Sequence, residues 1–250
     1  MADVVIEERR GDVLLLTVNR VERHNALNAA LNHWLGDAVR RADSEGAKVI
    51  VLTGAGPKSF CAGGDMLEMS GVEANATPLP SASERANASD ELARTPLPVI
   101  AAINGYCYGG GARLAIACDI RLASETATFR LPGAEYGLVV GAATLPRLVG
   151  TSKAKEWIYT ARKFEAAEAL ASGLLSSLHA PEELLPAALE MAELVASHSQ
   201  ESVRESKRVI DLATLSDEAQ AAEVEANSRL RGSDAQTARF RDATRKVTGR

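Results

Sequence analysis

Hydrophobic residues in the first half of the chain form short continuous runs in some segments and recur at helical spacing in another. Short apolar runs over 48–53 and 98–103 have the length and the β-branched content that are typical of buried strands. Two more segments, 4–9 and 13–19, flank a glycine turn and predict a hairpin. Over 25–42 the apolar residues recur at helical spacing. Strands and helices are therefore mixed here, as in an α/β protein.

The second half of the chain is mostly helical in pattern. Shorter elements come first, with helices expected over 65–69, 84–94 and 112–117 and strands over 119–123, 126–129 and 174–178. The four helices expected at the end of the chain cover 181–198, 200–213, 217–230 and 233–246. Residues 70–83 are rich in Ser, Ala, Pro, Gly and Asn and predict a mobile loop. We therefore predict a β/α body, residues 1–180, followed by a helical C-terminal region, residues 181–250.

Each of the two apolar runs leads into a glycine-rich turn and then into a helical segment. The first turn contains Gly63 and Gly64, and the second contains Gly109, Gly110 and Gly111. Backbone N–H groups at the start of a helix have no partner within it and attract negative charge. Two such turns can aim two donors at one oxygen that gains negative charge. The pair predicts an oxyanion hole; the alternative is that these glycines only permit tight packing.

The succession of strand, glycine turn and helix occurs twice, about fifty residues apart. We interpret the repetition as stacked turns of one β/α spiral, and a three-layer doubly wound sheet is the competing arrangement. The dinucleotide fingerprint GxGxxG is not matched, because Gly54-Ala55-Gly56 is not followed by a third glycine. A nucleotide-binding Rossmann fold is therefore disfavoured.

Composition and charge narrow the possible partners. The chain has 250 residues, of which 46% are hydrophobic, as is typical of a globular protein. Its formal net charge of −5 provides no positive electrostatic field that would attract nucleic acid. No apolar stretch approaches the ~20 residues that span a bilayer. The N-terminus has neither a basic segment nor an apolar core of a signal peptide. We expect a cytoplasmic protein that binds neither nucleic acid nor membranes.

Cysteine and histidine residues do not form a ligand pattern. Cys61, Cys107 and Cys118 lack metal-ligand spacing, and two of them lie in the glycine turns, where small side chains are needed. The four histidines are scattered along the sequence. We expect the cysteines to fill space in the core, and we predict no metal site.

The glycine turns and their surroundings resemble the crotonase superfamily of enoyl-CoA hydratases and isomerases, over most of the chain. The segments that carry the resemblance are His24-Asn25-Ala26-Leu27-Asn28, Phe60 to Met69, Pro98 to Gly105, the triple glycine, Ala117 to Arg121 and Gly137-Leu138. The resemblance implies a crotonase-like ββα spiral core and a helical C-terminal trimerisation region. The implied assembly is a homotrimer or a dimer of trimers.

The resemblance also implies a substrate and a site. Members of this superfamily bind acyl-CoA thioesters and stabilise the thioester enolate with two backbone amides, which here belong to Gly64 and Gly110. Coenzyme A enters as part of the substrate, and no separate cofactor is implied. The implied CoA contacts are Arg23, Ala26, Ala62, Asp65, Met66 and Leu67.

Several of these residues have a second interpretation. Arg23 faces a CoA phosphate or is a plain surface arginine. Asp65 forms part of the site or caps the short helix that it begins, since Asp favours that position. Phe240 closes over the adenine or packs its helix against the body.

The sequence departs from the family pattern at two positions. Typical hydratases of the family carry one glutamate three residues after the second oxyanion-hole glycine and another in a later Leu-Pro-Glu turn. Here these positions hold Arg113 and Gly133. In such hydratases the two carboxylates activate water and deliver a proton to carbon. Hydration by the paired-glutamate mechanism is therefore expected to be very weak or absent.

Two charged residues remain close to the expected site. Arg113 stays protonated and so is no base, but it could bind a substrate carboxylate, stabilise an enolate, pair with an acid or turn outward. Glu135 lies two residues beyond Gly133, an offset of about 200° on a helix, so it faces the site only after a local rearrangement. That rearrangement would allow an Arg113–Glu135 pair. Tyr108 and Tyr136 are proton donors or pocket walls, and we expect walls.

Two classes of function follow. The first is an enzyme of the enoyl-CoA hydratase/isomerase family, a lyase, an isomerase or an acyl-CoA hydrolase, that acts through an enolate but is not a standard hydratase. The alternative is a non-catalytic acyl-CoA carrier or sensor.

Overall fold

The computed structural model describes residues 3–73, 79–81 and 84–249, so the loop expected over 70–83 lies partly outside the described residues. The larger of two sheets has six strands. In spatial order they are β1 (Val5–Arg10), β2 (Val13–Val18), β3 (Val49–Gly54), β5 (Val99–Ile103), β7 (Ile120–Ser124) and β10 (Ser177–His179). The hairpin of β1 and β2 is antiparallel, as expected, and every other neighbouring pair is parallel.

A second sheet was largely missed by the sequence analysis, which expected only a strand over 126–129. Its four strands are β4 (Ser59–Cys61), β6 (Tyr106–Tyr108), β8 (Thr128–Arg130) and β9 (Lys163–Glu165). Strands β4, β6 and β8 each follow a strand of the larger sheet within a few residues and pair in parallel with one another. Each turn of the chain therefore adds one strand to each sheet, which is the ββα spiral that was predicted.

Helices of the body differ in how they begin, and a side chain caps three of them, at Asn28, Asp65 and Asn87. They are η1 (Val21–Arg23), α1 (Ala29–Ala42), α2 (Met66–Met69), α3 (Ala88–Arg94), α4 (Gly110–Ala117), α5 (Leu145–Val149), α6 (Thr151–Thr160) and α7 (Ala166–Ala171). Helix α1 was expected from residue 25 but starts four residues later, because the Asn28 side chain accepts the Leu31 N–H at 2.8 Å. Asn25 itself has φ +57°, which excludes it from the helix.

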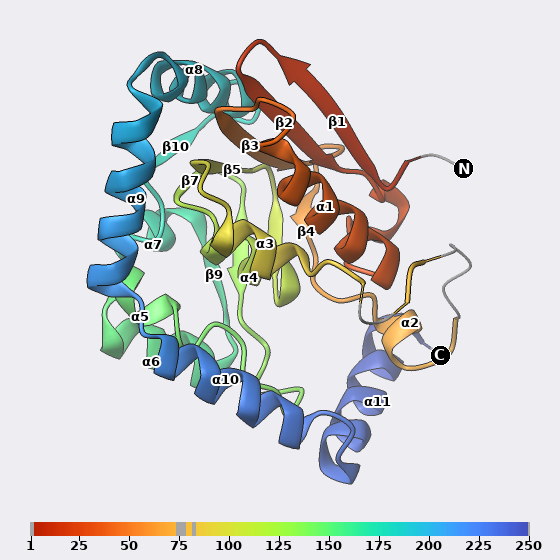
Figure 1. Ribbon diagram of the computed structural model, residues 1–250. Helices are drawn as coiled ribbons and strands as arrows, with labels where there is room; N and C mark the ends of the chain where they lie inside the picture. The colour runs from red at the N-terminus through yellow and green to blue at the C-terminus, as the bar shows by residue number, and fades with distance from the viewer. Residues whose placement is uncertain (1–2, 74–78, 82–83, 250) are drawn as a thin grey trace.

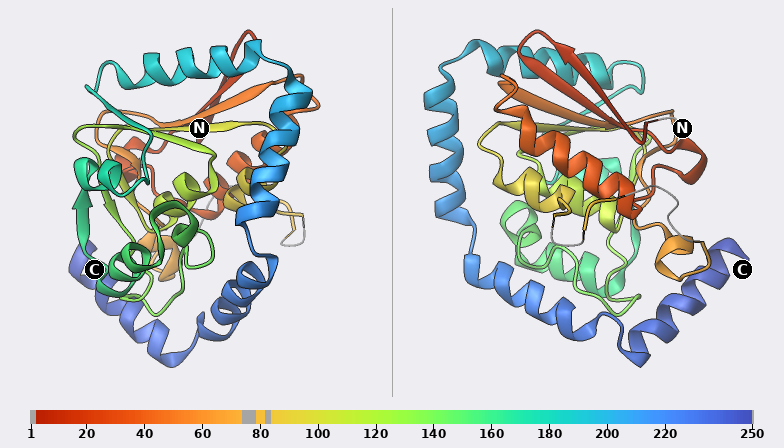
Figure 2. Two further views of the ribbon diagram at one scale, coloured as in Figure 1. Left: turned by 90° about the vertical axis from the view of Figure 1, so that its left-hand side faces the viewer. Right: turned by 45° about the vertical axis from the view of Figure 1, so that its right-hand side comes forward.

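Four helices follow the last strand and run around the body as a frame, as Figures 1 and 2 show. They are α8 (Leu184–Ser197), α9 (Gln200–Thr214), α10 (Asp217–Leu230) and α11 (Asp234–Thr248). Helix α8 covers the large sheet, with Leu184, Ala188 and Ala192 in one buried cluster with Val51 and Ile100. Among the described residues, every strand precedes residue 180 and only helices follow it, and α8 shares a core with the large sheet.

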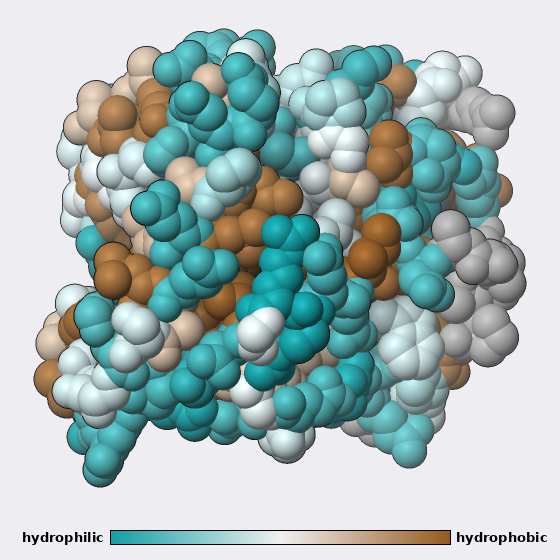
Figure 3. Space-filling view, turned by 90° about the horizontal axis from the view of Figure 1, so that it is seen from above, coloured by the Kyte–Doolittle hydropathy of each residue, from teal (hydrophilic) through white to brown (hydrophobic). Residues whose placement is uncertain are grey.

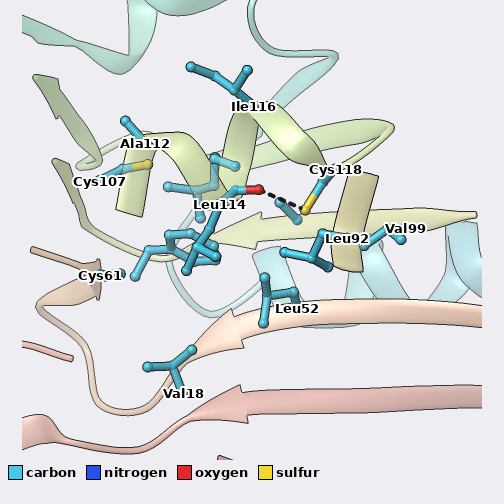
Figure 4. Packing of buried hydrophobic residues seen from close by; sticks show 14 of the residues in the cluster. Val18, Leu52, Cys61, Leu92, Val99, Cys107, Ala112, Leu114, Ile116 and Cys118 are labelled. Atoms are coloured by element: carbon cyan, nitrogen blue, oxygen red, sulfur yellow. Dashed lines mark hydrogen bonds between the residues drawn. The ribbon is translucent and has the colours of Figure 1, made fainter. Parts of the chain in front are cut away.

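The main core lies on the other face of the sheet, under α1, α3 and α4. Leu52, Leu92 and Leu114 are among its fully buried side chains (Figure 4). The three cysteines are also buried there, as expected, and the Cys118 thiol donates to the Leu114 carbonyl at 3.3 Å. Burial raises the pKa of Cys61 and of Cys118 to about 12. These thiols are therefore protonated at neutral pH and pack as small hydrophobic groups.

The surface mixes hydrophilic areas with apolar patches, the largest on the face seen from above lying near its middle (Figure 3). Within the described residues, no helix combines the length and the hydrophobicity that crossing a bilayer requires. The same residues contain no group of three or more His, Cys, Asp or Glu side chains placed to hold a metal ion.

Candidate functional site

The first glycine turn is fixed by pairing with the segment that precedes α1. The Leu27 N–H donates to the Gly63 carbonyl at 2.7 Å, and the Asp65 N–H donates to the Leu27 carbonyl at 2.8 Å. Along an extended segment, the hydrogen-bonding groups of successive residues point to opposite sides. The N–H of Gly64 therefore points away from Leu27.

The second glycine turn packs directly on the first. Gly109 has φ +49°, and its N–H donates to the Arg130 carbonyl at 2.9 Å. Gly110 is the first residue of α4, so its N–H has no partner inside the helix. A Cβ on Gly111 would lie 2.1 Å from the Cys61 carbonyl oxygen, so only glycine fits there.

The two turns bring the amides of Gly64 and Gly110 close together. A Cβ placed on Gly110 would lie 3.5 Å from the amide nitrogen of Gly64, and one placed on Gly63 would lie 3.7 Å from the amide nitrogen of Gly110. Among the hydrogen bonds of the described residues, neither of these N–H groups donates to an acceptor. Two neighbouring unpaired donors can stabilise one oxygen that becomes negative.

The space beside Gly64 is covered by Met69 of α2. A Cβ on Gly64 would lie 2.5 Å from the Met69 sulfur, and the Met69 side chain is 48% exposed. Neither of the two large cavities, of about 660 and about 500 Å³, includes Gly64 or Gly110 in its lining. Because methionine is unbranched and adaptable, a ligand can displace this side chain without moving the backbone.

Asp65 has the capping role that was the second interpretation of this residue. Its carboxylate accepts the N–H groups of Leu67 at 3.2 Å and Glu68 at 3.3 Å, and so begins α2. It also pairs with Arg20 at 2.9 Å, where both side chains are nearly buried. Leu67 is buried, and Met66 is partly exposed beside it. Asp65 therefore holds the first glycine turn in place.

Two residues that fix this region were not identified from the sequence. The Arg20 guanidinium also donates to the carbonyl of Ala26. The fully buried Asn25 side chain donates to the carbonyl of Ser59 at 2.7 Å and accepts the Arg20 N–H at 2.9 Å. In the sequence nothing separates Arg20 from a surface residue, and Asn25 was only the expected start of a helix and part of the segment His24 to Asn28, so the roles of both side chains follow from these contacts alone.

The residues assigned to CoA contacts lie along two adjacent segments, 23–27 and 62–67. The Ala62 N–H donates to the His24 carbonyl at 3.1 Å, which holds these segments side by side. Arg23 forms an ion pair of 2.8 Å with Glu73, and both side chains are more than a third exposed. A guanidinium this exposed can exchange that partner for a phosphate at little cost.

Arg113 and Glu135 do not form the pair suggested by the sequence. Arg113 forms an ion pair with Asp90 of α3 at 3.1 Å. Glu135 forms an ion pair with Arg130 and is exposed. The turn after Pro132 keeps a helical course, so the offset of two residues directs Glu135 outward. The rearrangement that the pair required has not occurred.

The chain is closed around Gly133, which stands at the position where typical hydratases of the family carry their second glutamate. A Cβ there would lie 2.8 Å from the Leu138 carbonyl oxygen and 2.9 Å from a methyl group of Val140. Such distances require neighbouring atoms to move, and one of them belongs to the backbone. A carboxylate side chain at this position therefore has no room in this structure.

The aromatic residues near the site have structural partners. The Tyr108 hydroxyl is 2.6 Å from the Thr128 hydroxyl. Tyr136 packs edge-on against Phe240 of α11, with 6.0 Å between ring centroids, and burial raises the pKa of Tyr136. Phe240 is only 7% exposed. This favours the packing interpretation of Phe240.

Comparison with known proteins agrees with the spiral fold and the paired glycine turns. The family model for enoyl-CoA hydratase/isomerase matches residues 8–247. The short-chain-enoyl-CoA hydratase of Clostridium acetobutylicum is 38% identical over 215 residues, which cover 83% of this chain and 80% of that protein. The crotonyl-CoA hydratase of Syntrophomonas wolfei is 35% identical, with coverage of 90% and 87%.

A solved structure of a similar protein has the same fold. The carnitinyl-CoA hydratase from Mycobacterium avium superimposes with a TM-score of 0.87 at 30% identity and covers 98% of this chain and 97% of its own. The chain therefore belongs to the enoyl-CoA hydratase/isomerase family, within the crotonase superfamily.

Proposed function

We propose that this protein binds an acyl-CoA thioester and stabilises the enolate form of its carbonyl oxygen with the amides of Gly64 and Gly110. What supports the proposal most is the approach of these two unpaired N–H groups to each other. When a proton leaves the carbon beside a thioester carbonyl, negative charge develops on the oxygen. Donors already aimed at that oxygen stabilise the charge, at about 2.7–4 kcal/mol for one donor in measured oxyanion holes.

The reaction proposed is not hydration by paired glutamates. Arg113 stands at one glutamate position and pairs with Asp90, while Gly133 stands at the other and is enclosed by Val140. An arginine cannot act as a general base at neutral pH. The enzyme reactions that this arrangement leaves open are isomerisation or decarboxylation through the enolate, and thioester hydrolysis, in which water adds to the carbonyl carbon, the same amides stabilise the tetrahedral oxyanion and the CoA thiolate leaves.

A hydration assay with crotonyl-CoA as substrate tests this proposal directly. We expect no saturable loss of the conjugated enoyl absorbance when crotonyl-CoA is added, while crotonyl-CoA still binds in calorimetry. Rapid saturable hydration would show that the interpretation of positions 113 and 133 is wrong. Absence of binding would contradict the acyl-CoA site itself.

A non-catalytic acyl-CoA carrier or sensor is the second candidate, favoured by the enclosure of Gly133. A panel of acyl-CoA thioesters, examined for binding by calorimetry and for products by mass spectrometry, separates the two functions. Binding of several thioesters with turnover of none supports the carrier. Conversion of any one of them supports the enzyme.

We further propose that the chain assembles as a homotrimer or a dimer of trimers through its C-terminal helices. Helix α9 has no buried residue, and its Val209, Ile210 and Leu212 side chains are 54–71% exposed. Apolar surface of this kind is typical of an interface between subunits. Light scattering of the purified protein is expected to give three or six times the chain mass of 26.4 kDa. A monomer mass would contradict the assembly.

A further inference from the structure

The side chain of Arg113 lines a cavity whose lining does not include the glycine turns. This cavity has a volume of about 500 Å³ and lies between α3, α4, residues 141–147 and α10. Gly110, Arg113 and Ala117 follow one another along a single face of α4, at intervals of three and four residues. The cavity is lined by Arg113 and Ala117, one and two turns beyond Gly110. One helical turn is about 5.4 Å, so an acyl chain held at Gly110 can reach it.

The acidic groups that line the cavity are already engaged. Asp90 pairs with Arg113 at 3.1 Å, and Asp211 pairs with Arg147 at 3.0 Å. The Glu223 carboxylate accepts the N–H groups of Gly141 and Ala143. The fourth, Asp119, pairs with a lysine outside the cavity, Lys207, at 2.8 Å.

Two arginines at the same cavity are not engaged. Arg94, at the end of α3, and Arg231, just after α10, are exposed and line the cavity. Within the described part of the chain, neither guanidinium takes part in an ion pair or a hydrogen bond. Arg113 makes a single bond to Asp90 and keeps other N–H donors available. The uncommitted charge at this cavity is therefore positive.

The cavity also has apolar surface on the side of α4 and α10, where Ile116, Ala117 and Val224 line it. Methylene groups can pack against these side chains, while a terminal anion reaches the guanidinium groups. Guanidinium binds carboxylate through two parallel hydrogen bonds, which makes it selective for that group. A plain fatty acyl chain would leave the guanidinium groups of Arg94 and Arg231, two of the four arginines that line the cavity, without an anionic partner.

We propose that this cavity, lined by Arg94, Arg113 and Arg231, binds the distal carboxylate of an acyl-CoA whose acyl group is a dicarboxylic acid. The inference rests on the proposed function, because it takes the thioester carbonyl to lie at Gly64 and Gly110. Arg113 is the cationic group closest to the thioester along α4, and Arg94 and Arg231 hold the carboxylate of a longer chain.

Calorimetry with matched ligands tests the inference. Adipyl-CoA and hexanoyl-CoA have acyl chains of six carbons and differ by a terminal carboxylate in place of a methyl group. We expect adipyl-CoA to bind at least about tenfold more tightly, as charged hydrogen bonds of this kind allow. The preference should fall below about threefold in the triple variant Arg94→Gln/Arg113→Gln/Arg231→Gln.

A matched control is Arg229→Gln, since Arg229 is exposed on α10 but does not line the cavity. Its preference for adipyl-CoA should equal that of the unaltered protein. Equal binding of the two ligands to the unaltered protein would overturn the dicarboxylate inference and leave the proposed function standing. A preference that survives the triple substitution would show that the carboxylate binds elsewhere. Failure of both ligands to bind would instead defeat the proposed function.

Discussion

The adjacent glycines Gly110 and Gly111 of the second turn have different roles. Gly111 has no room for a side chain, because a Cβ would meet the backbone carbonyl of Cys61. Gly110 has room at the expense of the flexible end of Leu27, whose methyl group lies 2.9 Å from the Cβ position. A methyl group on Gly110 would project toward the Gly64 amide. One glycine therefore maintains packing, and the other keeps the space at the amides open.

The same substitution at these two neighbours should have opposite consequences. Gly111→Ala is expected to destabilise the fold by about 1–3 kcal/mol or more, as overpacking does, measured by urea unfolding. Gly110→Ala should change stability less, yet weaken acyl-CoA binding at least about tenfold in calorimetry. If Gly110→Ala bound acyl-CoA normally, the proposed position of the carbonyl oxygen would be wrong.

The buried thiols give the protein a dependence on alkaline pH. The pKa of Cys118 is raised by burial from 9.0 to about 12. A raised pKa means that the folded state holds the proton more tightly than the unfolded state. The stability that this thiol contributes is therefore complete below pH 9 and is lost as pH rises toward 12. The unfolding free energy should fall over this range, and less steeply in Cys118→Ala. Identical slopes would contradict the account.

At the scale of elements, the long segments could be predicted from the sequence, whereas of the three-residue strands only β8 and β10 overlap strands that were expected. The strands of the large sheet and the C-terminal helices have apolar patterns long enough to show their period. Strands β4, β6 and β9 have three residues each, too few to alternate visibly. The glycine turns were predicted because glycine is needed there, whereas Arg20 and Asn25 depend on contacts with segments distant in sequence.

Helix α10 holds the loop that encloses Gly133. Glu223 accepts the N–H groups of Gly141 at 3.0 Å and Ala143 at 2.8 Å. In Glu223→Gln the amide replaces one charged acceptor, so hydrogen exchange at these two N–H groups should become faster, measured by NMR or mass spectrometry. The exposed Glu225 on the same helix provides the control Glu225→Gln, which should leave exchange unchanged. Equal exchange in both variants would show that the loop does not depend on Glu223.

At the scale of the whole molecule, the two sheets and the helices that follow their strands bring residues 64 and 110 together from separate turns of the spiral. The repeated strand–turn–helix order predicted that two glycine turns converge, and the family resemblance assigned the two amides to Gly64 and Gly110. The position of α8 on the sheet was not predictable, because its apolar pattern does not say which surface it covers. The cavity at Arg113 also depends on α10, which lies more than a hundred residues further along the chain.

The central claim is that a thioester oxygen is held by two backbone amides, and one comparison tests it most directly. Butyryl-CoA and its thioether analogue S-butyl-CoA differ in the carbonyl oxygen alone. Calorimetry should show butyryl-CoA binding at least about tenfold more tightly, with the difference abolished in Gly110→Ala. Equal affinities of the unaltered protein for the thioester and the thioether would contradict the account.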